Sequence, residues 1–206
     1  MKLNIHATGT IEHKHSILSL IRKAAQKVSS LFPLESIDVV VVSGKTPLGV
    51  TGNSFYDNTI MIIVDQKHTW EEIQKNVQPT FYHELHHLAR IKAVGYGRNL
   101  GGAVITEGLA LKMEEEMGGD VSPWKDFSNK KEREFVYDAF QEEKEAQGYD
   151  HDKWFFGENF PKWAGYRLGY ILVSLYCKQV NKRPSELFAV PANKILKLLN
   201  SNSASF

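Results

Sequence analysis

The chain has 206 residues, of which 42% are hydrophobic and 24% are charged, and its formal net charge at pH 7 is +1. These values are those of one ordinary globular domain, residues 1–206, and the near-zero charge gives no reason to expect nucleic acid or an anionic membrane as a partner. No apolar run approaches the roughly 20 residues that span a bilayer, and residues 1–6 lack the apolar core of a secretory signal, so the expected location is the cytoplasm.

The N-terminal third of the chain predicts one helix and two strands. Residues 13–32 place apolar side chains at three- and four-residue steps, which indicates an amphipathic surface helix. The β-branched run 37–42 predicts a strand largely buried on both faces, and residues 59–64 predict a second strand of the same type. The turn-rich stretch 43–58 between them is either a connector with a mobile tip or a segment that brings backbone close to a bound peptide. In the second case the strand 59–64 offers an open edge for that peptide.

Two helices are expected next. Thr69 and Glu72 form a capping-box pattern, which predicts a short helix up to about residue 78. Pro79 interrupts this helix and is well placed in the first turn of another one, which runs to about residue 94. The glycines between residues 95 and 102 then predict a loop.

The second of these helices carries His83-Glu84-Leu85-His86-His87, which matches the pattern H-E-x-x-H. Residues i and i+4 share one helix face, so His83 and His87 can reach the same ion. Neutral imidazole suits Zn²⁺, and a catalytic zinc site has three protein ligands with a fourth position open to water. Glu84 lies about 100° further around the helix, where its carboxylate can act on that water as a general base. The alternative is a surface helix with scattered histidines.

A third ligand is sought further along the chain. A site of the type H-E-x-x-H-x-x-G-x-x-H is excluded, because Arg90 and Ala93 stand where Gly and His are required. Glu107, twenty residues after His87, interrupts the otherwise apolar or small-residue run 104–110, and a partly buried carboxylate needs a partner such as a metal. On a second helix packed against the first, it would complete a His₂Glu zinc set. The alternative is an ordinary first-turn glutamate that the helix dipole favours. The single cysteine excludes cysteine-rich zinc sites.

The helix of Glu107 is expected to end near residue 117, with the glutamates 114–116 on a solvated face. A charged helix over residues 128–146 follows. The aromatic residues between 149 and 163 form either a hydrophobic substrate subsite or core packing under an irregular segment. In the last long helix, 163–181, Gly165 and Gly169 allow another helix to approach closely. Two short helices between residues 184 and 200 and a frayed end after Leu199 complete the chain.

Three segments together resemble a known family: H-E-L-H-H at 83–87, T-E-G-L-A at 106–110, and P-K-W-A-G-Y-R-L-G-Y at 161–170. They resemble the predicted zinc-dependent proteases of the gluzincin class, over about residues 15–200. The resemblance implies an α+β fold, a mainly helical zincin-like domain with a small β-sheet near the N-terminus. It also implies a zinc metallopeptidase with His83, His87 and Glu107 as metal ligands and Glu84 as catalytic base. It implies a peptide or protein substrate but does not indicate which one.

The expected reaction is hydrolysis of a peptide bond by zinc-activated water, with Glu84 taking the proton and passing it to the leaving amine. The developing oxyanion needs a further donor. Tyr166 is the candidate, because it lies just inside the helix that glycines bring close to the site, and a core tyrosine is the alternative. Tyr170 and Arg167 are further candidates for the same role.

Two other functions compete with the peptidase. One is a non-catalytic, zinc-stabilised binding or regulatory domain, and the other is a helical interaction module without metal. A purely structural zinc site closes its fourth position and has no use for Glu84, which favours the enzyme. The sequence leaves the oligomeric state open.

Overall fold

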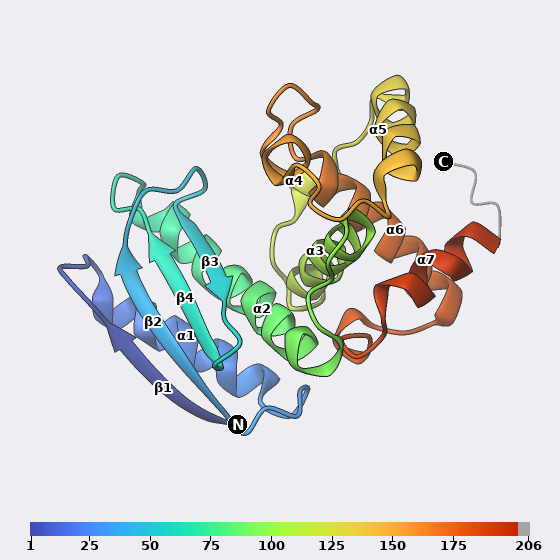
Figure 1. Ribbon diagram of the computed structural model, residues 1–206. Helices are drawn as coiled ribbons and strands as arrows, with labels where there is room; N and C mark the ends of the chain where they lie inside the picture. The colour runs from blue at the N-terminus through green and yellow to red at the C-terminus, as the bar shows by residue number, and fades with distance from the viewer. Residues whose placement is uncertain (202–206) are drawn as a thin grey trace. The chain divides into compact units, whose positions relative to one another are not determined.

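The computed structural model describes residues 1–201 and confirms the predicted class, a mainly helical α+β fold with a small sheet near the N-terminus (Figure 1). The chain forms two compact units. The first unit contains residues 1–92 and 113–120, and the second contains residues 93–112 and 121–206. Among residues 1–201, no helix has the length and apolar character that crossing a membrane requires.

The sheet of the first unit has the strand order β1-β2-β4-β3. Strands β1 (Lys2–Ala7), β2 (Ser36–Ser43) and β4 (Thr59–Val64) are parallel, whereas β3 (Val50–Ser54) pairs antiparallel with β4. Helices α1 (Lys14–Val28) and α2 (Trp70–Val94) lie on one face of this sheet (Figure 1). Residues of β2 and β4 therefore alternate between buried and half-buried positions, and the prediction of a strand buried on both faces is wrong.

The edge of the sheet also differs from the prediction. The stretch 43–58, expected to be irregular, contains β3, and β4 is consequently an internal strand. The open edge on this side is β3 and not residues 59–64. The sequence Val-Thr-Gly-Asn-Ser has few strong strand formers, so β3 owes its conformation to its pairing with β4. Strand β1 is a further element that the sequence analysis did not predict.

Helix α2 is continuous over 25 residues, so the predicted break at Pro79 is wrong. The capping box at its start is confirmed: the Glu72 amide donates to Thr69 Oγ1 at 3.3 Å, and the Thr69 amide donates to Glu72 Oε2 at 2.9 Å. A proline inside a helix costs about 3 kcal/mol. The side chains of Val77 and Phe81 on either side of Pro79 are fully buried, and this packing offsets that cost.

The second unit is built from helices. They are α3 (Leu100–Glu116), α4 (Ser122–Lys125), α5 (Lys130–Glu143), the π-helix η1 (Asp152–Phe156), α6 (Ala164–Val180), the 3₁₀-helix η2 (Pro184–Glu186) and α7 (Ala192–Ser201). Helix α3 contributes its last residues, from Met113 on, to the first unit. It begins at Leu100, so Gly101 and Gly102 are helical and not part of the predicted loop. Of the predicted frayed end after Leu199, residues 202–206 lie outside the described part of the chain.

Some of the aromatic residues between 149 and 163 pack in the hydrophobic core. Trp154 and Phe155, on the π-helix, are fully buried and belong to the main hydrophobic cluster of the second unit. Phe156, the next residue, is 60% exposed. The core-packing alternative therefore holds for Trp154 and Phe155.

The two glycines of α6, Gly165 and Gly169, pack against different segments. Gly169 lies against the backbone of α3: a Cβ at this position would be 2.3 Å from Val104 O and 3.0 Å from Gly108 N. Gly165 instead makes room for the ring of Phe155, which a Cβ would meet at 2.6 Å. The helix that approaches Gly169 is therefore α3, directly beside Glu107.

Substitution of Gly169 by Ala is expected to destabilise the second unit by about 1–3 kcal/mol, because the added methyl group overlaps a carbonyl oxygen that cannot rotate away. Helix propensity alone would give the opposite sign, a gain of about 1 kcal/mol. Thermal unfolding followed by circular dichroism measures the difference. Gln179→Ala, at an exposed position of the same helix, is the control. A Gly169→Ala variant that is more stable than the parent would contradict the close approach.

Candidate metal centre

His83 and His87 lie one helical turn apart on α2, as the sequence predicts, and their ring centroids are 4.5 Å apart. His87 is buried, and the side chain of His83 is 13% exposed. Both rings are thus largely shielded from water.

Glu114 orients His83. Its Oε1 lies 2.6 Å from His83 Nδ1, and its side chain is only 12% exposed. An ionised carboxylate can only accept, so Nδ1 carries the shared hydrogen and Nε2 presents its lone pair. Zinc-binding histidines commonly donate their other N–H to a carboxylate in this way. The expectation that residues 114–116 form a solvated face is therefore wrong for Glu114. A signal was available, because Glu114 follows Glu107 by seven residues, two helical turns on the same face.

Glu84 is seated against the edge strand β3. Its side chain is 5% exposed, and Ser54 Oγ lies 2.8 Å from its Oε2 and 2.6 Å from its backbone oxygen. Gly52 faces the same side chain: a Cβ on Gly52 would lie 2.4 Å from Glu84 Cγ and 2.9 Å from Oε1. The absence of a side chain at Gly52 and the hydroxyl of Ser54 thus define where the Glu84 carboxylate lies. Neither residue was identified from the sequence, since both lie in the stretch expected to be a loop.

Glu107 is buried in α3, and Tyr96 contacts it directly. The Tyr96 hydroxyl donates a hydrogen bond to Glu107 Oε1. Burial of the phenol, followed by the negative charge of Glu107, raises the pKa of Tyr96 well above its ordinary value. Tyr96 therefore stays protonated and acts as a donor. The sequence analysis did not single out Tyr96, because its contact with Glu107 depends on the path of the glycine-containing loop.

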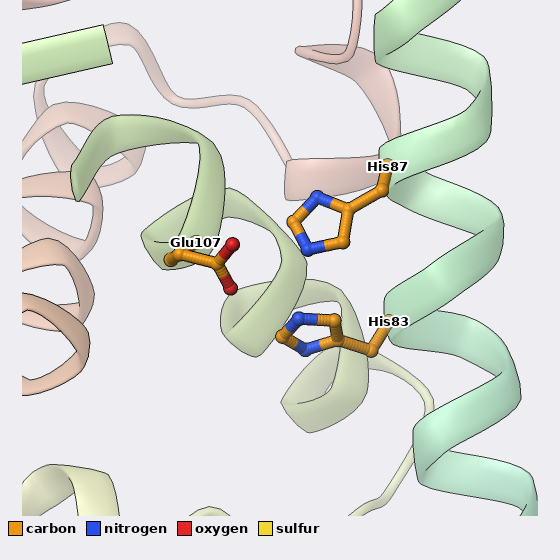
Figure 2. A group of neighbouring side chains, drawn as sticks. All are labelled: His83, His87 and Glu107. Carbon is orange, nitrogen blue, oxygen red and sulfur yellow. The ribbon is translucent and has the colours of Figure 1, made fainter. Parts of the chain in front are cut away.

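His83, His87 and Glu107 each offer one ligand atom, and these atoms all lie within 4.8 Å of one another (Figure 2). Two imidazoles and a carboxylate form a donor set that suits Zn²⁺. The three residues thus fit a zinc ion, and the tautomer of His83 agrees with this role.

Tyr166, the predicted oxyanion donor, lies near the start of α6 in the second unit and is half-buried. Its ring is 4.9 Å from that of Trp124 and 5.0 Å from that of Phe155, centroid to centroid. Its catalytic role stays a prediction. Arg167, a further candidate for the oxyanion donor, forms an ion pair with Glu132 at 3.3 Å, and this ion pair is a structural role for its side chain.

Comparison with known proteins gives two likenesses. A family model described as a predicted Zn-dependent protease (DUF2268) matches residues 17–197. Among solved structures, the fold is similar to that of an aminopeptidase N family protein from Idiomarina loihiensis, with a TM-score of 0.53 at 12% sequence identity. The similarity covers 98% of this chain and 40% of that protein, so the chain spans less than half of its neighbour's length. No curated protein matches the chain.

Proposed function

This chain belongs to the family of predicted Zn-dependent proteases (DUF2268), and from this membership we propose that it is a zinc metallopeptidase of the gluzincin type. In this proposal His83, His87 and Glu107 are the zinc ligands, Glu84 is the catalytic base and Tyr166 is the oxyanion donor. The observation that carries the proposal is the convergence of the three ligand atoms within 4.8 Å of one another.

The surroundings of Glu84 support a catalytic rather than a structural zinc site. When bound, zinc polarises the scissile carbonyl and lowers the pKa of a water ligand toward 7. The Glu84 carboxylate accepts a proton from the attacking water and delivers it to the leaving amine. Ser54 and Gly52 hold this carboxylate in place, which lowers the cost of orienting it for proton transfer. Tyr166 then donates to the oxygen on which negative charge develops.

The edge strand β3 suggests how a peptide binds. Its outer side is not paired within residues 1–201, since β4 occupies only the other side. An extended peptide that adds to β3 would be held by main-chain hydrogen bonds, which do not depend on its side chains. Because Gly52 and Ser54 of the same strand touch Glu84, such a peptide would pass close to the base. The proposed substrate is therefore an extended peptide or protein segment.

Two further parts of the hypothesis stay predictions. One is that residues 1–206 act as a single zincin-like domain, and the other is that the protein works in the cytoplasm.

Metal removal tests the proposed function. Elemental analysis of the purified protein is expected to find one zinc per chain, and digestion of a peptide library is expected to stop when a chelator is added and to resume when zinc is restored. The library should contain peptides with free and with blocked N-termini, because the solved neighbour is an aminopeptidase N family protein. Cleavage that persists without metal would contradict the proposal. Stoichiometric zinc without cleavage of any peptide would favour the non-catalytic zinc-stabilised domain instead.

A further inference from the structure

Tyr96 lies beside the proposed ligand Glu107 in the second unit. It lies between Gly95 and Gly97, whose φ angles of +81° and +107° belong to a region that side chains other than glycine rarely adopt. The two glycines fold the chain back toward α3. The Tyr96 hydroxyl then donates to Glu107 Oε1.

The backbone of this loop is fixed to the same helix. Thr106 Oγ1 donates to the carbonyl oxygen of Tyr96 at 2.8 Å. The side chain of Asn99 accepts a hydrogen bond from the Gly102 amide at 2.9 Å, and a Cβ on Gly102 would lie 3.0 Å from Gly97 Cα. Tyr96 is thus attached to α3 through its main chain and through its hydroxyl. A phenol held at both ends loses little further freedom when it keeps the carboxylate in place.

A hydrogen bond to one carboxylate oxygen restricts how that carboxylate can bind an ion. A carboxylate accepts through two oxygens and can bind a cation through one or both. Tyr96 engages Oε1, so the arrangement favours binding of the ion through Oε2 alone. Binding through one oxygen keeps four-coordinate geometry within reach, with three protein ligands and one position for water.

We propose that Tyr96 is a positioning residue that holds Glu107 as a one-oxygen zinc ligand and thereby sets the affinity of the site for zinc. This inference rests on the proposed zinc site and adds to it a residue outside the family motifs. In this inference the glycines of the loop between α2 and α3, together with the hydrogen bond from Thr106, place the Tyr96 hydroxyl against Glu107. Outer partners of metal ligands typically account for about 10–100-fold in metal affinity.

The test is the zinc dissociation constant of Tyr96→Phe, measured by competition with a chromophoric chelator. Loss of the hydroxyl alone is expected to weaken zinc binding by about 10–100-fold. The visible spectrum of the Co²⁺-loaded variant should lose intensity, because a released carboxylate can bind through both oxygens and raise the coordination number. Tyr149→Phe is the matched control. This tyrosine is in the same unit, burial and then the charge of Glu107 raise its pKa, and its ring packs against His151 and Phe155. Its zinc affinity should equal that of the parent.

The possible outcomes distinguish a failure of this inference from a failure of the proposed function. A parent protein that does not bind zinc overturns the proposed function. A parent that binds zinc, with Tyr96→Phe binding it within twofold and with an unchanged Co²⁺ spectrum, overturns the role of Tyr96 alone. If Tyr96→Phe does not fold, Thr106→Val replaces it, since this change removes the hydroxyl that donates to the Tyr96 carbonyl oxygen. Weaker zinc binding in Thr106→Val with recovery in Thr106→Ser supports the inference, and parental affinity in Thr106→Val contradicts it.

Discussion

Replacement of Glu84 by Gln is expected to lower peptidase activity by about 10²–10⁴-fold, the usual contribution of a general acid–base group. The side-chain amide of the introduced Gln fills the same volume between Ser54 and Gly52 but cannot accept a proton from water. Zinc content should not change, because Glu84 is not among the three grouped ligand residues. Initial rates on a peptide that the parent cleaves, together with metal analysis of the same samples, measure both quantities.

Glu71→Gln is the matched control, an exposed glutamate in the first turn of the same helix, and it should keep parental activity. The competing hypothesis of a zinc-stabilised binding domain makes the reverse prediction. In that case Glu84→Gln changes nothing that can be measured, whereas His83→Ala unfolds the protein. Equal activity of Glu84→Gln and the parent at equal zinc content would therefore refute the assignment of the base.

Gly52→Ala is expected to have the second large effect, a loss of about 10²-fold in activity, the typical result of misplacing a catalytic group by about 1 Å. The new Cβ would lie 2.4 Å from Glu84 Cγ, and this atom is near the root of the side chain, so the carboxylate must move. Zinc affinity is expected to remain at the parental value. The measurements are kcat on the same peptide and a zinc competition titration.

Asn53→Ala, the next residue of β3, controls for damage to the strand itself. Asn53 is exposed and pairs with Met61 in the ladder, so its truncation should leave activity intact. If Gly52→Ala displaces only the Glu84 side chain, its unfolding temperature should equal that of Asn53→Ala. Full activity in Gly52→Ala would show that Glu84 can occupy another position without loss of activity. The contacts of Glu84 with Ser54 and Gly52 would then have no catalytic role.

The sequence predicts those parts of the candidate site that lie on one helix. His83, Glu84 and His87 belong to α2, where spacing alone decides which side chains share a face. The burial of Glu107 also follows from local sequence, since its neighbours are apolar or small. These residues are recognisable because their pattern is periodic.

The contacts that organise the site could not be predicted, because they join segments far apart in the chain. Ser54 and Glu84 are 30 residues apart, and His83 and Glu114 are 31 apart. The glutamate run by itself does not show which member is buried. The seven-residue spacing from Glu107 singles out Glu114, but its pairing with His83 is decided by tertiary packing. The same holds for Pro79, where helix propensity predicts a break that packing of the neighbouring side chains overrides.

The hydroxyl of Ser54 has one hydrogen and two acceptors within reach, the carbonyl oxygen and the carboxylate Oε2 of Glu84. While Glu84 is ionised, the hydrogen can point to Oε2. Once the carboxyl group carries its own proton, Oε2 can donate to Oγ and the hydroxyl can turn to the carbonyl. Rotation about a single C–O bond would thus keep Glu84, the proposed base, hydrogen-bonded both with and without a proton and without displacement of any heavy atom.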